Sequence, residues 1–124
     1  MKAILRSGFL ALAIMAMAVP VYAGPFEDAL AAAQRGDYVT ALRLLRPLAE
    51  QGHAGAQSNF GTMYHFGQGV PPDYVSAHMW FTFAAAQGYE NAQDKLDFVA
   101  KRMTPDQIAE AQRMARKWMA KHQQ

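Results

Sequence analysis

Residues 37–57, DYVTALRLLRPLAEQGHAGAQ, recur 36 residues later as residues 73–93, DYVSAHMWFTFAAAQGYENAQ. Nine of the 21 aligned positions are identical, far more than unrelated segments share. A period of this length is typical of helical solenoids, in which each unit buries its apolar face by stacking on a neighbour. The repeat therefore predicts an all-α chain made of stacked helical hairpins.

Apolar residues inside each copy are spaced three and four positions apart, which places them on one face of a helix. In the first copy these residues are Ala41, Leu44, Leu45, Leu48 and Ala49, and in the second they are Ala77, Trp80, Phe81, Ala84 and Ala85. Asp37 and Asp73 are expected to cap the helices that follow them. Thr104 and Gln107 form a capping box around Pro105.

These signals predict six helices, over about 26–35, 37–51, 53–66, 73–87, 89–103 and 105–121. The Gly- and Pro-rich stretch 67–72 is expected to be a loop. The fold is predicted to be an α/α superhelical repeat solenoid of about three helical hairpins with one continuous elongated core. Its repeat units are expected over about 25–52, 53–88 and 89–122, the last including a C-terminal capping helix.

The first 23 residues have the plan of a secretory signal peptide. Lys2 and Arg6 precede an uncharged run of 11 residues, Phe9 to Val19, and Val21-Tyr22-Ala23 supplies small residues at the cleavage positions. The run is too short for an ordinary membrane anchor. We expect cleavage after Ala23, a folded domain over 24–124, and a periplasmic or secreted protein without an integral membrane segment.

Charge and composition exclude several classes of protein. Loss of Lys2 and Arg6 would leave ten basic residues against ten acidic ones, so the mature chain gives no support for nucleic-acid binding. The chain contains no cysteine, which excludes disulfides, cysteine-ligated metals and a thiol nucleophile. Seven of the ten remaining basic residues fall within 95–124, which indicates either a solvated last helix or a docking site for an acidic partner.

The repeat resembles the Sel1-like repeat family, a relative of the tetratricopeptide repeats. The matching residues are Ala56, Gln57, Gly61, Met63, Tyr64, Gly67, Gly69, Val70, Pro71, Asp73, Tyr74, Ala77, Trp80, Ala84, Ala85, Gln87, Gly88 and Ala92. The third unit departs from the pattern at Asp97, where the repeat has Gly61, and is expected to be a terminal cap. The resemblance implies an interaction module and names no partner.

Residues that could carry chemistry form no recognisable constellation. His65 and His78 flank the 67–72 loop and could approach each other, but a metal site would need a third ligand. Ser58 and Ser76 lie outside any nucleophile elbow. Asp94 and Asp97 lie on one helical turn among basic residues, as on a solvated face. We therefore expect no catalytic residues, no metal and no cofactor.

The resemblance implies that the first helix of each hairpin lines a concave binding face. The predicted contact residues are Ser58, Asn59, Thr62, His65, Asp94, Lys95, Phe98, Lys101 and Arg102. Asn59 is expected to act as a hydrogen-bond clamp, as in tetratricopeptide relatives. Lys95, Lys101 and Arg102 would supply positive charge for an acidic or C-terminal peptide. The alternative is that these are ordinary solvated polar residues.

We therefore expect a non-enzymatic module of the bacterial cell envelope that binds a partner protein or peptide. Two alternatives remain open. One is an envelope enzyme or a cell-wall or polysaccharide-associated factor. The other is a structural subunit that self-associates through the exposed ends of the stack.

Overall fold

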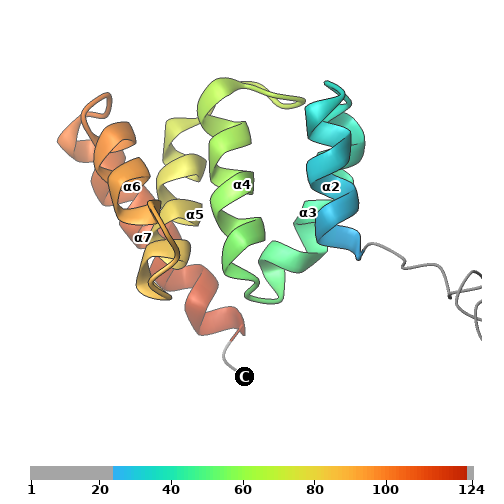
Figure 1. The fold of residues 1–124 in the computed structure, drawn as a ribbon. Helices are drawn as coiled ribbons and strands as arrows, with labels where there is room; N and C mark the ends of the chain where they lie inside the picture. The colour runs from blue at the N-terminus through green and yellow to red at the C-terminus, as the bar shows by residue number, and fades with distance from the viewer. Residues whose placement is uncertain (1–23, 123–124) are drawn as a thin grey trace, which may run out of the picture.

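The computed structural model describes residues 24–122, and within this range the chain is all-helical (Figure 1). Its elements are α2 (Pro25–Gln34), α3 (Tyr38–Glu50), α4 (Ala54–Phe66), α5 (Tyr74–Ala86), α6 (Ala92–Ala100) and α7 (Pro105–His122). The predicted all-α repeat fold with six helices is confirmed. The expected signal peptide, 1–23, lies outside the described residues.

The helix starts follow the local sequence signals. The Asp37 and Asp73 side chains accept hydrogen bonds from the backbone N–H groups of Thr40 and Ser76, at 3.2 and 3.0 Å. Thr104 and Gln107 exchange the two bonds of a capping box at 2.9 and 3.1 Å. These caps satisfy N–H groups that have no partner within the helix, so the local sequence sets where α3, α5 and α7 begin.

The loop after α4 depends on a glycine. Gly67 ends the helix in the left-handed conformation, with φ of 67°, and its N–H donates to the Met63 carbonyl. A Cβ at this position would lie 2.6 Å from Pro72, which packs over the turn. The loop therefore needs glycine both for its backbone angle and for space.

The predicted helix over 89–103 is wrong at both ends, because α6 covers only Ala92–Ala100. Residues 89–91 form a turn, in which Asn91 adopts a left-handed conformation with φ of 64°. Residues 101–103 form a second turn that leads into the Thr104 cap. The result is a helix of nine residues, shorter than its counterparts in the preceding unit.

The first two hairpins pack as expected, α2 against α3 and α4 against α5. The last two helices depart from this arrangement, because α6 and α7 each pack mainly against α5 instead of against each other. In Figure 1, α6 stands in front of α7, and α5 lies between α4 and α6. Thus α5 is the element on which the C-terminal half of the domain is assembled.

The interior consists of two apolar clusters, so the expectation of one continuous core is wrong. The larger cluster joins α2, α3, α4, α5 and α7 and includes Leu45, Phe60 and Trp80. The smaller cluster joins α5 to α6 and α7 and includes Phe81 and Val99. The half-buried side chain of Tyr64 packs against both clusters and connects them.

Candidate binding groove

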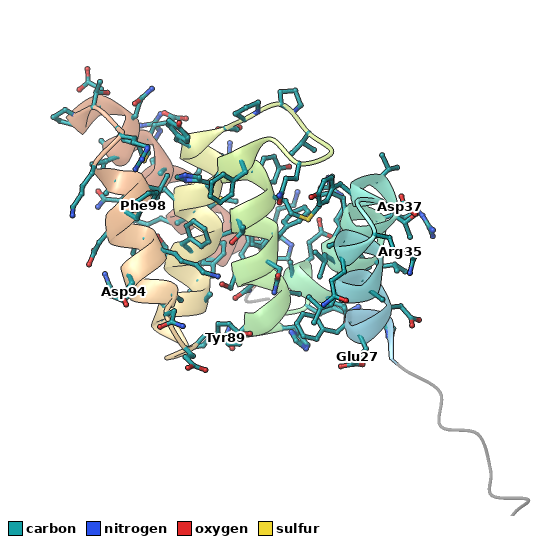
Figure 2. All side chains as sticks on the ribbon, turned by 45° about the horizontal axis from the view of Figure 1, so that its top comes forward. Glu27, Arg35, Asp37, Tyr89, Asp94 and Phe98 are labelled. Atoms are coloured by element: carbon teal, nitrogen blue, oxygen red, sulfur yellow. The ribbon has the colours of Figure 1, made fainter. Side chains whose placement is uncertain are left out.

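A cavity of about 420 Å³ opens between α4 and α6, with α5 beneath it. Its lining residues are Thr62, His65 and Phe66 of α4, Phe81 of α5, Asn91, which caps α6, and Asp94, Lys95 and Phe98 of α6. We call this cavity the α4–α6 groove. It exists because α6 packs on α5 while its backbone stays apart from that of α4. Figure 2 places Asp94 and Phe98 on α6 and Tyr89 in the turn before it.

Lys95 supplies a partly desolvated positive charge to the α4–α6 groove. Its ammonium donates a hydrogen bond of 3.2 Å to the hydroxyl of Ser58, which is fully buried in α4. Burial lowers the pKa of the Lys95 ammonium below its ordinary value of 10.5. A cation that has lost part of its hydration and is paired with a neutral hydroxyl gains more from an incoming carboxylate than an exposed lysine does.

Aromatic rings surround His65 at one end of the groove. The His65 ring lies 4.5 Å from Phe66, 5.3 Å from Tyr74 and 5.5 Å from Phe98, measured between ring centroids. Burial, and secondarily the charge of Arg102, lowers the pKa of this histidine below 6.5. A neutral imidazole is therefore favoured at pH 7, and this end of the groove presents a largely apolar surface.

Two of these aromatic side chains remain open to solvent. Phe66 is 62% exposed and Phe98 is 48% exposed, although both line the groove. The Arg102 guanidinium lies 4.0 Å from the centroid of the Phe98 ring in a cation–π arrangement. Exposed aromatic side chains beside a concave surface are typical of sites that bind another molecule.

Five of the nine predicted contact residues line the groove: Thr62, His65, Asp94, Lys95 and Phe98. Ser58 lies below the surface and reaches the groove only through Lys95. Lys101 is exposed outside the lining, and Arg102 acts through the Phe98 ring.

The predicted clamp residue Asn59 is occupied within its own helix. Its side-chain amide donates a hydrogen bond of 2.8 Å to the carbonyl of Gly55, one turn earlier, and Asn59 is absent from the groove lining. An asparagine in the middle of a helix can satisfy its amide in this way without leaving the helix. The structure therefore gives no support for the clamp.

Sequence reasoning missed Phe66, Phe81 and Asn91. Helical spacing could have identified two of them. Phe66 is four residues after Thr62, and Asn91 is three residues before Asp94, so each lies on the face already identified. Phe81 belongs to the predicted apolar face and is buried, with 3% exposure, and it also forms the floor of the groove.

The two histidines that flank the 67–72 loop have separate surroundings. His65 contacts aromatic rings, whereas the His78 ring lies 3.5 Å from the Thr82 hydroxyl within α5. Within residues 24–122 there is no cluster of three His, Cys, Asp or Glu side chains that could hold a metal ion. The same range contains no helix long and apolar enough to cross a bilayer.

Comparison with known proteins agrees with this architecture. The Sel1 repeat profile matches residues 30–53 and 54–89. A 34-residue stretch, 27% of this chain, is 53% identical to an uncharacterised protein of Neisseria meningitidis serogroup B. The crystal structure of c5321, a protective antigen present in uropathogenic Escherichia coli strains and displaying an SLR fold, superposes on 79% of this chain with a TM-score of 0.70 and 27% identity.

Both of these proteins are much longer than this chain, which spans 7% of the Neisseria protein and 22% of the Escherichia coli protein. Sel1 repeats generally act as protein–protein interaction modules and are typically non-enzymatic. The repeat matches, the related structure and the helical architecture agree with one another. Residues 30–53 and 54–89 are therefore Sel1-like repeats, within an all-α helical repeat fold.

Proposed function

We propose that this chain is an exported, non-enzymatic interaction module of the bacterial cell envelope, and that it binds a partner protein or peptide in the α4–α6 groove. The observation that carries the proposal is the half-buried Lys95 ammonium, which lies in a groove flanked by the exposed rings of Phe66 and Phe98. A peptide with a carboxylate next to an apolar side chain would satisfy both features.

The surroundings of Lys95 favour an acidic ligand. Its hydrogen bond to Ser58 uses one of the three ammonium donors, and the lining contributes one carboxylate, Asp94. Arg102, held over the Phe98 ring, adds a second positive charge at the rim. Most of the specificity is expected to come from the carboxylate, and most of the buried apolar area from the aromatic rings.

Peptide display against the purified domain tests this binding. Selected peptides should be enriched in Asp, Glu or a free C-terminal carboxylate beside an aromatic or aliphatic residue. Lys95→Gln should raise their Kd about tenfold or more, in line with the ~1.5–3 kcal/mol of a hydrogen bond to a charged group. Arg43→Gln, which removes an exposed positive charge from α3, is the matched control and should leave Kd unchanged. If Lys95→Gln and Phe98→Ala each bound the selected peptides as tightly as the wild-type domain does, the groove would not be the binding site.

Export is supported by the sequence of residues 1–23, which has a basic start, an apolar run and small residues at 21 and 23. N-terminal sequencing of the protein from a periplasmic or secreted fraction should give Gly24 as the first residue. Recovery of the chain in the cytoplasm with residues 1–23 intact would contradict this part of the proposal.

A further inference from the structure

A second concave surface lies between α5 and α7. It has a volume of about 270 Å³ and is lined by Met79, Met114, Lys117, Trp118 and Lys121. We call it the α5–α7 pocket. None of its lining residues takes part in the α4–α6 groove.

The two concavities use opposite sides of α5. Phe81 forms the floor of the α4–α6 groove, whereas Met79 lines the α5–α7 pocket. Residues two positions apart on an α-helix are rotated by about 200° around its axis, so these side chains point in nearly opposite directions. In Figure 1, α7 lies behind α5 and α6 stands in front, in agreement with this geometry.

The floor of the pocket combines a fixed aromatic ring with flexible thioethers. The Trp118 ring lies 4.8 Å from Phe83 and 5.7 Å from Trp80, and it stacks on His122 at 3.8 Å. Met79 and Met114 complete the apolar surface. Methionine side chains adapt to the shape of an inserted group, and a half-buried tryptophan offers a large contact area.

The rim of the pocket is positively charged. Lys117 and Lys121 are both exposed and lie one turn apart on α7, about 6 Å along the helix axis. Within residues 24–122 the one ion pair, Arg113 with Glu110, involves neither lysine. Arg116 adds a further exposed positive charge on the same helix. The apolar floor is thus bordered by cations without carboxylate partners in the described part of the chain.

We propose that the α5–α7 pocket binds an acidic amphipathic helix of a partner protein. An apolar side chain of that helix would enter between Met79, Met114 and Trp118, and carboxylates four residues apart would pair with Lys117 and Lys121. The spacing of the two lysines matches that of such carboxylates on a helix lying along α7. A concave floor fits one inserted side chain and does not fit the flat surface of a lipid bilayer.

This proposal is independent of binding in the α4–α6 groove. Because the two surfaces are on opposite sides of α5 and share no lining residue, both can be occupied at once. Together with the proposed binding in the groove, on which this last step rests, the domain would link two partners, one through an acidic peptide in the groove and the other through an acidic helix in the pocket.

Trp118 provides a direct readout of binding. The chain contains two tryptophans, and Trp80→Phe leaves Trp118 as the sole tryptophan, which can be excited selectively at about 295 nm. The probe is a 14-residue helical peptide with Leu and Phe on one face and Glu residues four apart beside them. A matched peptide has Gln in place of Glu. The Glu peptide should shift the Trp118 emission, and the shift should saturate as the peptide concentration is raised. The Gln peptide should bind at least fivefold more weakly.

Charge variants locate the probe. Lys117→Gln with Lys121→Gln should weaken binding of the Glu peptide at least fivefold, whereas Arg43→Gln, which removes an exposed positive charge from α3, should leave it unchanged. If Trp80→Phe fails to fold, methyl-¹³C methionine spectra of the wild-type protein replace the fluorescence. In these spectra the signals of Met79 and Met114 should move, and that of Met63, which is buried in α4, should not.

Four results would overturn the proposal. The Glu peptide could fail to bind, or could bind the double lysine variant as tightly as the wild type. Vesicles of phosphatidylglycerol could shift Trp118 when the peptide does not, which would assign the surface to lipid. Sedimentation could show a dimer that Lys117→Gln with Lys121→Gln dissociates, which would assign the surface to a second copy of this chain.

Discussion

The ammonium of Lys95 in α6 donates a hydrogen bond of 3.2 Å to the hydroxyl of Ser58 in α4, and this bond joins two helices whose backbones do not pack closely together. The two residues are 37 positions apart in the sequence. The bond ties the two sides of the α4–α6 groove together while leaving other ammonium donors available to a ligand.

A double-mutant cycle should measure this connection. Ser58→Ala, Lys95→Met and the combined variant are predicted to show a coupling energy of about 0.5–1.5 kcal/mol in urea unfolding, because the bond is partly buried and involves a charged donor. Strict additivity of the two single changes would show that the bond does not stabilise the fold. Retained helical content by circular dichroism is the control for correct folding.

Gln57 is predicted to contribute more to the stability of the fold than Gln93, its counterpart in the next repeat, does. Its buried side chain donates to the Ala49 carbonyl at 3.1 Å and accepts from the Gln87 amide at 2.8 Å. Gln57→Leu should therefore lower the free energy of unfolding by about 1–3 kcal/mol.

The matched control is Gln93→Leu, 36 residues later, because the Gln93 side chain is exposed and bonds only to Asp97. This change should alter the free energy of unfolding by less than about 0.5 kcal/mol. Equal effects of the two substitutions, measured by the same denaturant titration, would contradict the assigned role of Gln57.

Gly61 is predicted to be required for close packing between α4 and α5. A Cβ there would lie 2.7 Å from two atoms of the Phe81 ring, which is itself buried. Gly61→Ala should therefore destabilise the domain by about 1–3 kcal/mol, even though alanine favours helix formation. In a Phe81→Leu background, Gly61→Ala should lower the free energy of unfolding by clearly less than it does in the wild type. If the urea concentration at the midpoint of unfolding were unchanged or higher for Gly61→Ala, the predicted clash with the Phe81 ring would be wrong.

Stability is predicted to fall as the pH drops from 7.5 to 5. Burial lowers the pKa of both His65 and His78 below 6.5 in the folded protein. Below pH 6.5 the unfolded chain binds protons at these groups while the folded chain does not, so the free energy of unfolding decreases until the folded-state pKa values are passed. Replacing both histidines with glutamine should flatten this dependence, as followed by urea unfolding across the range. If the free energy of unfolding of the double variant depended on pH as steeply as that of the wild type, the prediction would be wrong.

Helix positions could be predicted well where local interactions decide them. Asp37, Asp73 and Thr104 cap their helices through contacts within four residues, and Gly67 ends α4 through its own backbone angle. Prediction failed at residues 89–103, where Asn91 adopts a left-handed conformation that the repeat pattern does not reveal. It also failed for the core, since the buried apolar residues form two clusters, one reaching α2, α3 and α4 and the other reaching α6, with α5 and α7 contributing to both.

The same division applies to the binding residues. Periodicity alone determined that this chain is a helical repeat, and it put Thr62, His65, Lys95 and Phe98 on the helix faces that line the groove, because side-chain direction along a helix follows from the spacing of residues. Only the tertiary structure decided that α4 and α6 stand apart over Phe81, that Lys95 is desolvated against Ser58, and that Asn59 is bonded within its own helix. These features depend on the relative positions of whole helices. Those positions are set by the summed packing of side chains that are distant in the sequence.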